Sequence, residues 1–419
     1  HPQHRRQRQM CIRDRLGSVR DEESIITGAT PLIHALNSPY CMEAVPTLLR
    51  LGENIEHETR DSRTALIAAA LSGVTDRVAL CLRNGAKANQ ETRTGATAMS
   101  AVIKKLGMPI QMATEESYQD DINGENVLKF LLTNAIDKAN VNHENKNGVT
   151  LSMFAARAFS NNPRVLALLL DHGADKNVES SKGSTLLLDA LQFGCDDAVD
   201  LLIVEVVDVN YETRKNTAEV LTPLILAAKR GSVFQIEQLL AAGADINYET
   251  KAGETALMAA VSASRADHVS ALMSIGNADA NYEVKHGKTK GDTAIVLAGR
   301  LGHKDVIQRL ISSHNVDPSR GLSDKTTPLI RAVVDEDADA VKHMLLAGVP
   351  INVESAEGYT PLVEAAKKPS RMRCLEALCD FDASIVDFET SRGFSALHEA
   401  CKVGNEEAVL AMCLKYGAN

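Results

Sequence analysis

The sequence predicts an all-α repeat protein, a solenoid of about eleven helix-turn-helix repeats joined by β-hairpin loops. The tripeptide Thr-Pro-Leu opens the same pattern at positions 30, 222, 327 and 360. Threonine or serine recurs in that context at steps of 33 to 38 residues, with a single step of 53. A fixed period near 33 residues is typical of a repeat array and overrides a count of globular domains from length. The eleven repeats are numbered by these positions: Thr30, Thr64, Thr97, Thr150, Thr185, Thr222, Thr255, Thr293, Thr327, Thr360 and Ser395.

The loop and the start of the first helix are clearest in residues 239–272. A turn, Gly243-Ala244-Asp245-Ile246-Asn247, precedes the extended run Tyr248 to Lys251, and Gly253 then leads to Thr255. The threonine hydroxyl can accept a hydrogen bond from a free amide of the first helical turn. Where proline follows, it occupies a position that needs no N–H donor. The threonines therefore predict helix starts.

The two helices of a repeat differ in character. The first is small and apolar, as in residues 224–228, so that a neighbouring helix can approach closely. The second places Val233, Ile236, Leu239 and Leu240 on one stripe. Gly243 then supplies the left-handed residue that ends the helix.

These residues resemble the ankyrin repeat, whose pattern is Gly-x-Thr-Pro-Leu-His, an alanine pair, Leu-Leu and Gly-Ala-Asp-x-Asn. The resemblance covers about residues 25–419, and residues 173–177 and 243–247 match its turn closely. The family's histidine is present only as His398, and six other repeats have an apolar residue in its place: Ile33, Ile67, Met258, Val296, Ile330 and Val363. Residues 313–318 lack the Gly-Ala-Asp turn, which predicts a local irregularity there.

Three segments are set apart from the regular period. Residues 1–20 carry six arginines against one aspartate and share no periodicity with the rest, so they are interpreted as an unstructured or non-native basic leader. The resemblance implies that residues 21–419 form an ankyrin-repeat array. Within the array, an acidic insertion at about 104–124 is expected to be a flexible, solvated loop. Because the chain stops at Gly417-Ala418-Asn419, within another turn, we interpret it as a fragment.

Composition narrows the class of partner. No apolar run has the length of a membrane span, and eight scattered cysteines form no disulfide framework, so an intracellular, cytoplasmic location without membrane insertion is expected. Without residues 1–20 the net charge of −10 becomes −15. An acidic body argues against nucleic acid and favours protein partners.

The search for chemistry predicts no catalytic residues, no cofactor, no metal and no enzyme activity. The run His286 to Thr289 lacks the first glycine of a phosphate-binding loop, because Tyr282 stands in its place. Cys374 and Cys379 have no partners at zinc spacing. His398 is interpreted as a stacking residue of the repeat.

Each hairpin carries a recurring charge pattern. A glutamate is followed two residues later by lysine or arginine in six hairpins, beginning with Glu58 and Arg60. Residues i and i+2 share one face of an extended chain, so stacked hairpins are expected to form a ladder of alternating acid and base. The ladder is interpreted as solvated salt bridges or, alternatively, as a charged rail that selects partners. On the opposite face, Tyr211, Tyr248 and Tyr282 are expected either to form an aromatic binding strip or to cover the hairpin bases.

The resemblance also implies a binding surface, because ankyrin proteins bind partners across the hairpin tips and the exposed face of the first helices. The corresponding residues here are Lys229, Arg230, Lys251, Glu254, Arg300, Tyr359, Lys367, Lys368 and Phe394. Most of the charged ones are basic, so repeats six to ten are expected to bind an acidic or phosphorylated peptide.

The predicted function is a non-catalytic protein–protein interaction scaffold that uses its concave face and hairpin tips. One alternative is a targeting or regulatory arm of a larger multidomain enzyme of the kinase or ubiquitin ligase type. Another is a modification substrate, because residues 239–247 and 169–177 resemble ankyrin sites of asparaginyl hydroxylases, with Asn247 and Asn177 as acceptors. The partner, the pathway and the oligomeric state are not specified by these patterns.

Overall fold

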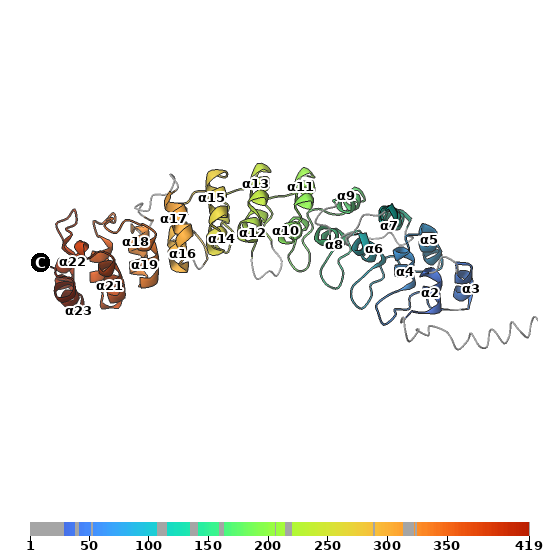
Figure 1. Ribbon diagram of the computed structural model, residues 1–419, viewed down its shortest axis with the longest axis horizontal. Helices are drawn as coiled ribbons and strands as arrows, with labels where there is room; N and C mark the ends of the chain where they lie inside the picture. Colours follow the sequence, from blue (N-terminus) through green and yellow to red (C-terminus); the bar gives the residue numbers. More distant parts are fainter. Residues whose placement is uncertain are drawn as a thin grey trace, which may run out of the picture. The chain divides into compact units, whose positions relative to one another are not determined.

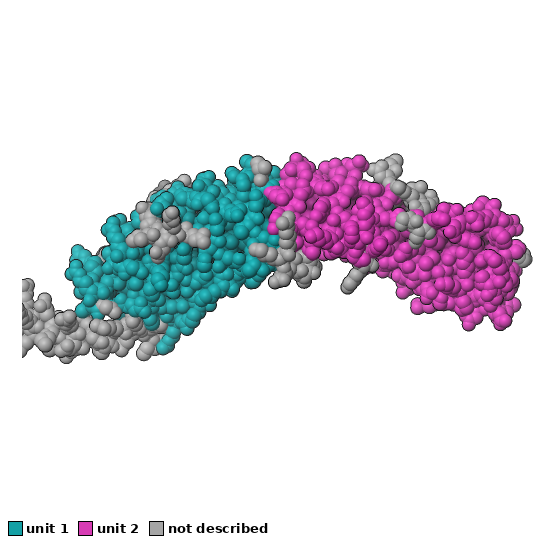
Figure 2. Space-filling model, turned by 180° about the vertical axis from the view of Figure 1, so that it is seen from behind, with its two compact units in different colours: residues 1–207 teal, residues 208–419 magenta. Residues whose placement is uncertain are grey.

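The computed structural model describes residues 29–37, 42–51, 53–106, 115–134, 141–158, 163–205, 207–213, 220–287, 290–312, 322 and 325–418. The predicted basic leader, residues 1–20, and the irregularity predicted at residues 313–318 lie outside these ranges. The chain divides into two compact units, residues 1–207 and 208–419 (Figure 2). Among the described residues the regular structure is entirely helical, which confirms the predicted fold class.

The first unit contains repeats 1 to 5. Its helices are α2 (Pro31–Asn37), α3 (Val45–Arg50), α4 (Ala65–Leu71), α5 (Thr75–Arg83), α6 (Ala98–Leu106), α7 (Glu115–Asn134), α8 (Leu151–Ala158), α9 (Arg164–Asp171), α10 (Leu186–Gln192) and α11 (Asp196–Val204), with a 3-10 turn at Met42–Ala44. The first helices α2, α4, α6, α8 and α10 pack in succession. Their alanines and leucines are buried and form the core.

The second unit contains repeats 6 to 11. Its helices are α12 (Pro223–Arg230), α13 (Val233–Ala241), α14 (Ala256–Ser262), α15 (Ala266–Ser274), α16 (Ala294–Leu301), α17 (Lys304–Ser312), α18 (Pro328–Val334), α19 (Ala338–Leu346), α20 (Pro361–Ala366), α21 (Met372–Phe381), α22 (Ala396–Val403) and α23 (Glu406–Leu410), with 3-10 turns at Pro369–Arg371 and Ala383–Asp387 and a π-helical turn at Ala411–Lys415. First helices pack on first helices, as α12, α14 and α16 do, while α13 packs on α15 (Figure 1). The two rows form the two layers of the unit.

The predicted helix starts are confirmed. Ten of the eleven recurring hydroxyls accept a hydrogen bond from the amide three residues on, as Thr255 does from Met258 at 3.2 Å. Thr293 is the exception: its Oγ is buried without a partner. Gly243 has φ of +88°, the left-handed conformation predicted for the helix end.

The loops fold back as hairpins without forming strands in the described part of the chain. The hairpin of repeat 7 is closed by two backbone bonds, from Thr250 N–H to Glu254 C=O at 3.0 Å and from Gly253 N–H to Thr250 C=O at 2.9 Å. The chain reverses within the four-residue step from Thr250 to Glu254, which is too short for a ladder of hydrogen bonds between two strands. The predicted hairpin is therefore present as a turn.

The acidic insertion is not a loop throughout, and this expectation was wrong for its second half. Residues 107–114 lie outside the described ranges, but α7 begins at Glu115 and provides the second helix of repeat 3. Val127, Leu128 and Leu131 are fully buried, and α7 packs on α5 and α6. Once residues 127–131 anchor the helix, extending it toward its N-terminus is easier than nucleating a new one.

Candidate functional site

Three of the six basic residues predicted for the binding surface are held in ion pairs within the second unit. Lys229, in the last turn of α12, lies 3.1 Å from Glu254 of the next repeat. Arg300, in the last turn of α16, contacts Asp292 at 2.5 Å and also pairs with Asp335. Lys367 lies 2.6 Å from Glu364. The array therefore neutralises three cations that were expected to face a partner.

Burial strengthens the Arg300 pair. Asp292 is 1% exposed, and burial raises the pKa of its carboxyl, while Arg300 and Arg331 oppose that effect. Arg331 in turn contacts Asp335 at 3.2 Å. Removing one member would leave a buried charge unpaired, which is costly, so this network is a structural feature of repeats 8 and 9.

Tyr359 and Lys367, two of the predicted residues, lie against each other in the second unit. The ammonium of Lys367 lies 3.4 Å from the centre of the Tyr359 ring, and the guanidinium of Arg392 lies 5.7 Å from it. Both distances are within the range of cation–π attraction. Phe394, in the next hairpin, is 41% exposed. Lys368 and Arg230 are exposed at the ends of α20 and α12.

The hairpin tyrosines contact the glutamates that were expected on the opposite face. The Tyr248 hydroxyl donates to Glu212 at 2.6 Å, and the Tyr282 hydroxyl donates to Glu249 at 2.7 Å. Each bond joins neighbouring repeats, and both tyrosines are half-buried, as is Tyr211. These contacts favour the structural interpretation, in which the tyrosines cover the hairpin bases.

The glutamates form a ladder, but not the ladder of acid and base that the sequence suggested. Six hairpin glutamates accept the backbone N–H of the next hairpin, as Glu249 does from Lys285 at 3.0 Å. We call the set the glutamate ladder; it pairs Glu58 with Arg93 N–H, Glu91 with Lys146, Glu144 with Ser181, Glu212 with Lys251, Glu249 with Lys285 and Glu354 with Ser391. Two donors are serines, so the basic side chain is not required. Among these six pairs only Arg93 adds a side-chain ion pair, at 3.2 Å from Glu58.

The electrostatics of the ladder follow from its donors. Burial works against ionisation of Glu249, but donors from Tyr282, Lys285 and His286 outweigh it and hold the pKa of this carboxyl below its ordinary value. The pKa of Glu58 is likewise lowered, since its bonds to Arg93 outweigh burial. Both carboxylates are therefore held charged by the next repeat.

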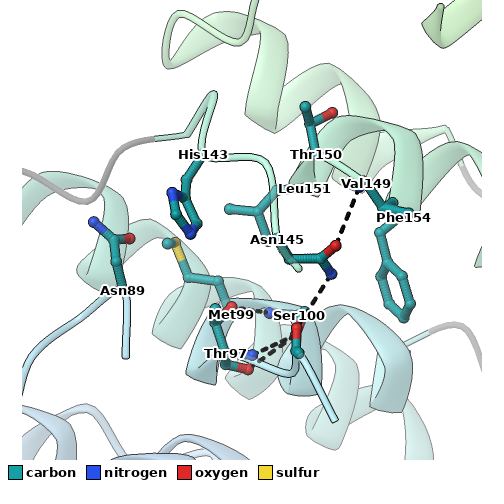
Figure 3. Close-up of a pocket in the computed structure, with 11 residues that line it drawn as sticks. Asn89, Thr97, Met99, Ser100, His143, Asn145, Val149, Thr150, Leu151 and Phe154 are labelled. Atoms are coloured by element: carbon teal, nitrogen blue, oxygen red, sulfur yellow. Dashed lines mark hydrogen bonds between the residues drawn. The ribbon is translucent and has the colours of Figure 1, made fainter. Parts of the chain in front are cut away.

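The first unit carries a groove that the sequence analysis did not identify. Its volume is about 960 Å³, and it lies between the hairpins of repeats 2 to 4 and the helices α4, α6 and α8. A smaller cavity of about 20 Å³ adjoins it, and Figure 3 shows Ser100, Asn145 and Phe154 lining that cavity. These three residues also line the groove. One feature of the sequence could have indicated this groove. Ser100 is small and polar, whereas repeats 2, 7 and 8 have Ile67, Met258 and Val296 at the aligned position.

Side chains with possible chemistry have structural partners. The His398 ring accepts the Ser395 backbone N–H at 3.2 Å and contacts its hydroxyl at 2.8 Å, which completes a capping box at the start of α22. Cys374 and Cys379 are buried, and burial raises their pKa values to about 11 and about 12.

Across the described ranges no cluster of three or more potential metal ligands is present. None of the helices described has the length and apolarity to cross a membrane.

The two asparagines considered for hydroxylation lie in turns. Asn247 Oδ1 accepts the Asp279 N–H at 3.0 Å, and the Asn247 N–H bonds Asp245 at 3.0 Å. The Asn177 N–H bonds Asp175 at 2.9 Å in the same kind of turn. The Asn247 side chain and the Asn177 backbone amide therefore belong to the loop framework.

Comparison with known proteins identifies the family. The model of ankyrin repeats matches residues 119–213, 187–284 and 329–419, which together are more than half of the sequence. The chain belongs to the ankyrin repeat family, whose arrays are protein–protein interaction modules.

Individual relatives match only parts of the chain. Rabankyrin-5 of Homo sapiens is 31% identical over 203 residues, which are 48% of this chain and 15% of the relative. Tyrosine-protein kinase Shark of Drosophila melanogaster is 36% identical over 92 residues, 22% of this chain and 10% of the kinase. The ankyrin repeat domain of Bcl-3 is 23% identical, with a TM-score of 0.46, over 57% of this chain and 95% of that domain. The chain thus spans 15% or less of the length of Rabankyrin-5 and of the Shark kinase.

Proposed function

We propose that this chain is an intracellular scaffold that binds partner proteins through the concave face and the hairpin loops of its repeats, without chemistry of its own. The observation that carries the proposal is the family match together with the groove of the first unit. In a repeat array each unit contacts mainly its neighbours, so the fold offers extended surfaces rather than an enclosed active site.

In the second unit, the proposed contact residues are Lys229, Arg230, Lys251, Glu254, Arg300, Tyr359, Lys367, Lys368 and Phe394, with the three hairpin tyrosines beside them. Lys229, Arg300 and Lys367 already have carboxylate partners, so an acidic or phosphorylated segment would have to exchange with them. Tyr359 and exposed Phe394 provide aromatic area of the kind that is enriched at interfaces.

Proximity labelling in cells with the tagged full chain tests the proposal. Lys229, Arg230, Lys367 and Lys368 are changed together to glutamate, and the matched control changes Lys304 and Lys342, exposed on the outer helices α17 and α19. We expect the fourfold reversal to remove a set of partners that the control retains. If no specific partner is labelled by the unaltered chain, the proposal of a binding scaffold is wrong.

A second candidate is that the array targets or regulates a larger enzyme. Its support is that one relative is a tyrosine-protein kinase and that the matched segment is a tenth of it. The sequence of the full-length gene product tests this candidate: a kinase or ubiquitin ligase domain in the same chain supports it, and a product of ankyrin repeats alone contradicts it.

A further inference from the structure

We propose that the groove of repeats 2 to 4 binds an extended acidic segment of a partner protein, with one apolar side chain of that segment seated on the groove floor. This proposal rests on the proposed function, because it assigns a site and a partner chemistry to the binding array. The site differs from repeats 6 to 10, where the sequence alone had suggested an acidic partner.

The shape of the groove fits an extended chain. Three successive repeats build it, each giving a hairpin to one wall and a first helix to the other. Packed helices lie about 8–10 Å apart, so three repeats span roughly 20 Å between the outer two. An extended chain advances about 3.3 Å per residue, and about six residues fit that length.

The floor of the groove is apolar. Ile67, Ala101 and Phe154 line it from α4, α6 and α8. Ser100 stands beside them where repeat 2 has Ile67 at the aligned position, so the floor of repeat 3 lacks a large side chain. The Ser100 hydroxyl is turned to its own helix start, donating to the Thr97 carbonyl at 3.0 Å. The groove beside Ser100 can therefore take an aliphatic or aromatic side chain of the bound segment.

The rim of the groove is held by bonds between hairpins. The Asn145 side chain donates to the Gly95 carbonyl at 3.1 Å and accepts from the Val149 N–H at 3.1 Å. Asn147 donates to the Thr94 carbonyl at 3.1 Å. These bonds fix the hairpins of repeats 3 and 4 before any partner arrives, so binding does not have to order them.

The charge of the lining is opposite to that of the whole chain. Four cations, Arg60, Arg63, Lys104 and Arg157, line the groove with one carboxylate, Asp61, while the chain as a whole carries −10. The Arg63–Asp61 pair is exposed, and such pairs contribute little, so it is easily exchanged. Lys104 is exposed and has no ion pair among the described residues.

Arg157 is positioned by a buried carboxylate and by an aromatic ring that is 51% exposed. Its Nε and Nη2 lie 3.0 and 2.8 Å from Asp189, which is 1% exposed, and its guanidinium lies 5.3 Å from the Phe193 ring. Its Nη1 has no partner within the described ranges. A guanidinium fixed in this way can donate to a carboxylate without losing much side-chain freedom. The acidic body of the chain repels a long polyanion, which favours a short acidic peptide over nucleic acid.

The test measures binding of fluorescein-labelled octapeptides to the full chain by fluorescence anisotropy. The probes carry aspartate and glutamate around a central leucine or phenylalanine; a lysine-substituted set, a phosphoserine set and a single-stranded DNA oligonucleotide are compared. Three variants are used: Lys104→Glu, which reverses a groove charge, Ser100→Ile, which fills the floor with the residue of repeat 2, and Arg83→Glu, the matched control on the outer helix α5.

We expect the acidic peptides to bind, and Lys104→Glu and Ser100→Ile each to weaken binding about tenfold, while Arg83→Glu leaves it unchanged. Binding should also weaken between about 50 and 500 mM salt. Equal weakening by Arg83→Glu, or preference for DNA or for the lysine peptides, overturns the proposal. Tighter binding of phosphoserine peptides alone assigns the groove to phosphate instead. If no acidic peptide binds while the unaltered chain still labels specific partners in cells, this inference is wrong and the scaffold function stands.

Discussion

At the scale of single residues, the hairpin glutamates connect one repeat to the next. Glu249 accepts four donors from repeat 8: the Tyr282 hydroxyl, the Lys285 and His286 amides, and the His286 ring. Its side chain is 6% exposed, so these bonds replace water almost completely. Hydrogen bonds to a charged acceptor are stronger than neutral ones.

Glu249→Gln should therefore destabilise the second unit by about 1–3 kcal/mol, because the charge that the donors stabilise is lost. The pKa of Glu249 is lowered in the folded chain, so its contribution is full above the unfolded glutamate pKa near 4.3 and is lost as pH falls through the lowered value. Urea unfolding across pH measures both effects. The control is Glu357→Gln, since Glu357 is exposed. Equal losses in the two variants would refute the role of the ladder.

At the scale of the helix, the contribution of a threonine cap to stability can be measured by comparing two helices. Thr255 and Thr293 stand at the same place in successive repeats, and both are buried. Thr255 caps α14, whereas the Thr293 hydroxyl finds no partner at the start of α16. A buried hydroxyl without a bond costs free energy.

Thr255→Ala should cost about 1 kcal/mol of stability, which is the usual value of an N-cap. Thr293→Ala should cost clearly less, because it removes an unsatisfied group rather than a bond. Thermal unfolding of both variants against the unaltered chain provides the comparison. A larger loss for Thr293→Ala than for Thr255→Ala would contradict the assigned bonding.

At the scale of the whole molecule, contacts join mainly adjacent repeats. Within the second unit, α13 packs on α12 and α15, and α21 packs on α19 and α20. Leu239 of α13 and Leu375 of α21 are both fully buried. In such an array a local defect weakens its neighbours before it reaches distant repeats.

Leu239→Ala should destabilise by about 2–5 kcal/mol and reduce amide protection chiefly in α12 to α15. Leu375→Ala is the matched change and should reduce protection chiefly in α19 to α22. Hydrogen-exchange mass spectrometry distinguishes the two patterns. Uniform loss of protection across α12 to α22 in both variants would mean that the unit unfolds as one cooperative block.

Features that depend on local rules could be predicted from the sequence, and those that depend on distant partners could not. The threonine caps and the left-handed Gly243 follow from short-range geometry. The acceptor role of Glu249 needed its donor 36 residues away, and the i, i+2 spacing directed attention to Lys251 instead. Ser181 and Ser391, which stand where other hairpins have a cation, were the signal that side-chain charge was not the link.

The binding surface was less predictable for the same reason. The acid that neutralises Lys229 lies on the next hairpin, and one that neutralises Arg300 precedes its own helix. The α7 helix was missed because the anchor at Val127 to Leu131 lies beyond the acidic stretch that suggested a loop. The groove includes Ser100, which is smaller than the aligned residues Ile67, Met258 and Val296. The effect of that smaller side chain on the surface becomes visible only when the repeats are stacked.

The glutamate ladder has a consequence for protein engineering. Because each rung ends on a backbone amide, the residue that supplies the amide can be replaced without removing the bond; of the common residues only proline lacks the donor. Positions 93, 146, 181, 251, 285 and 391 are thus available for randomisation in a library, provided that the six glutamates are kept. Their exposed side chains would then supply new recognition surfaces on an unchanged framework.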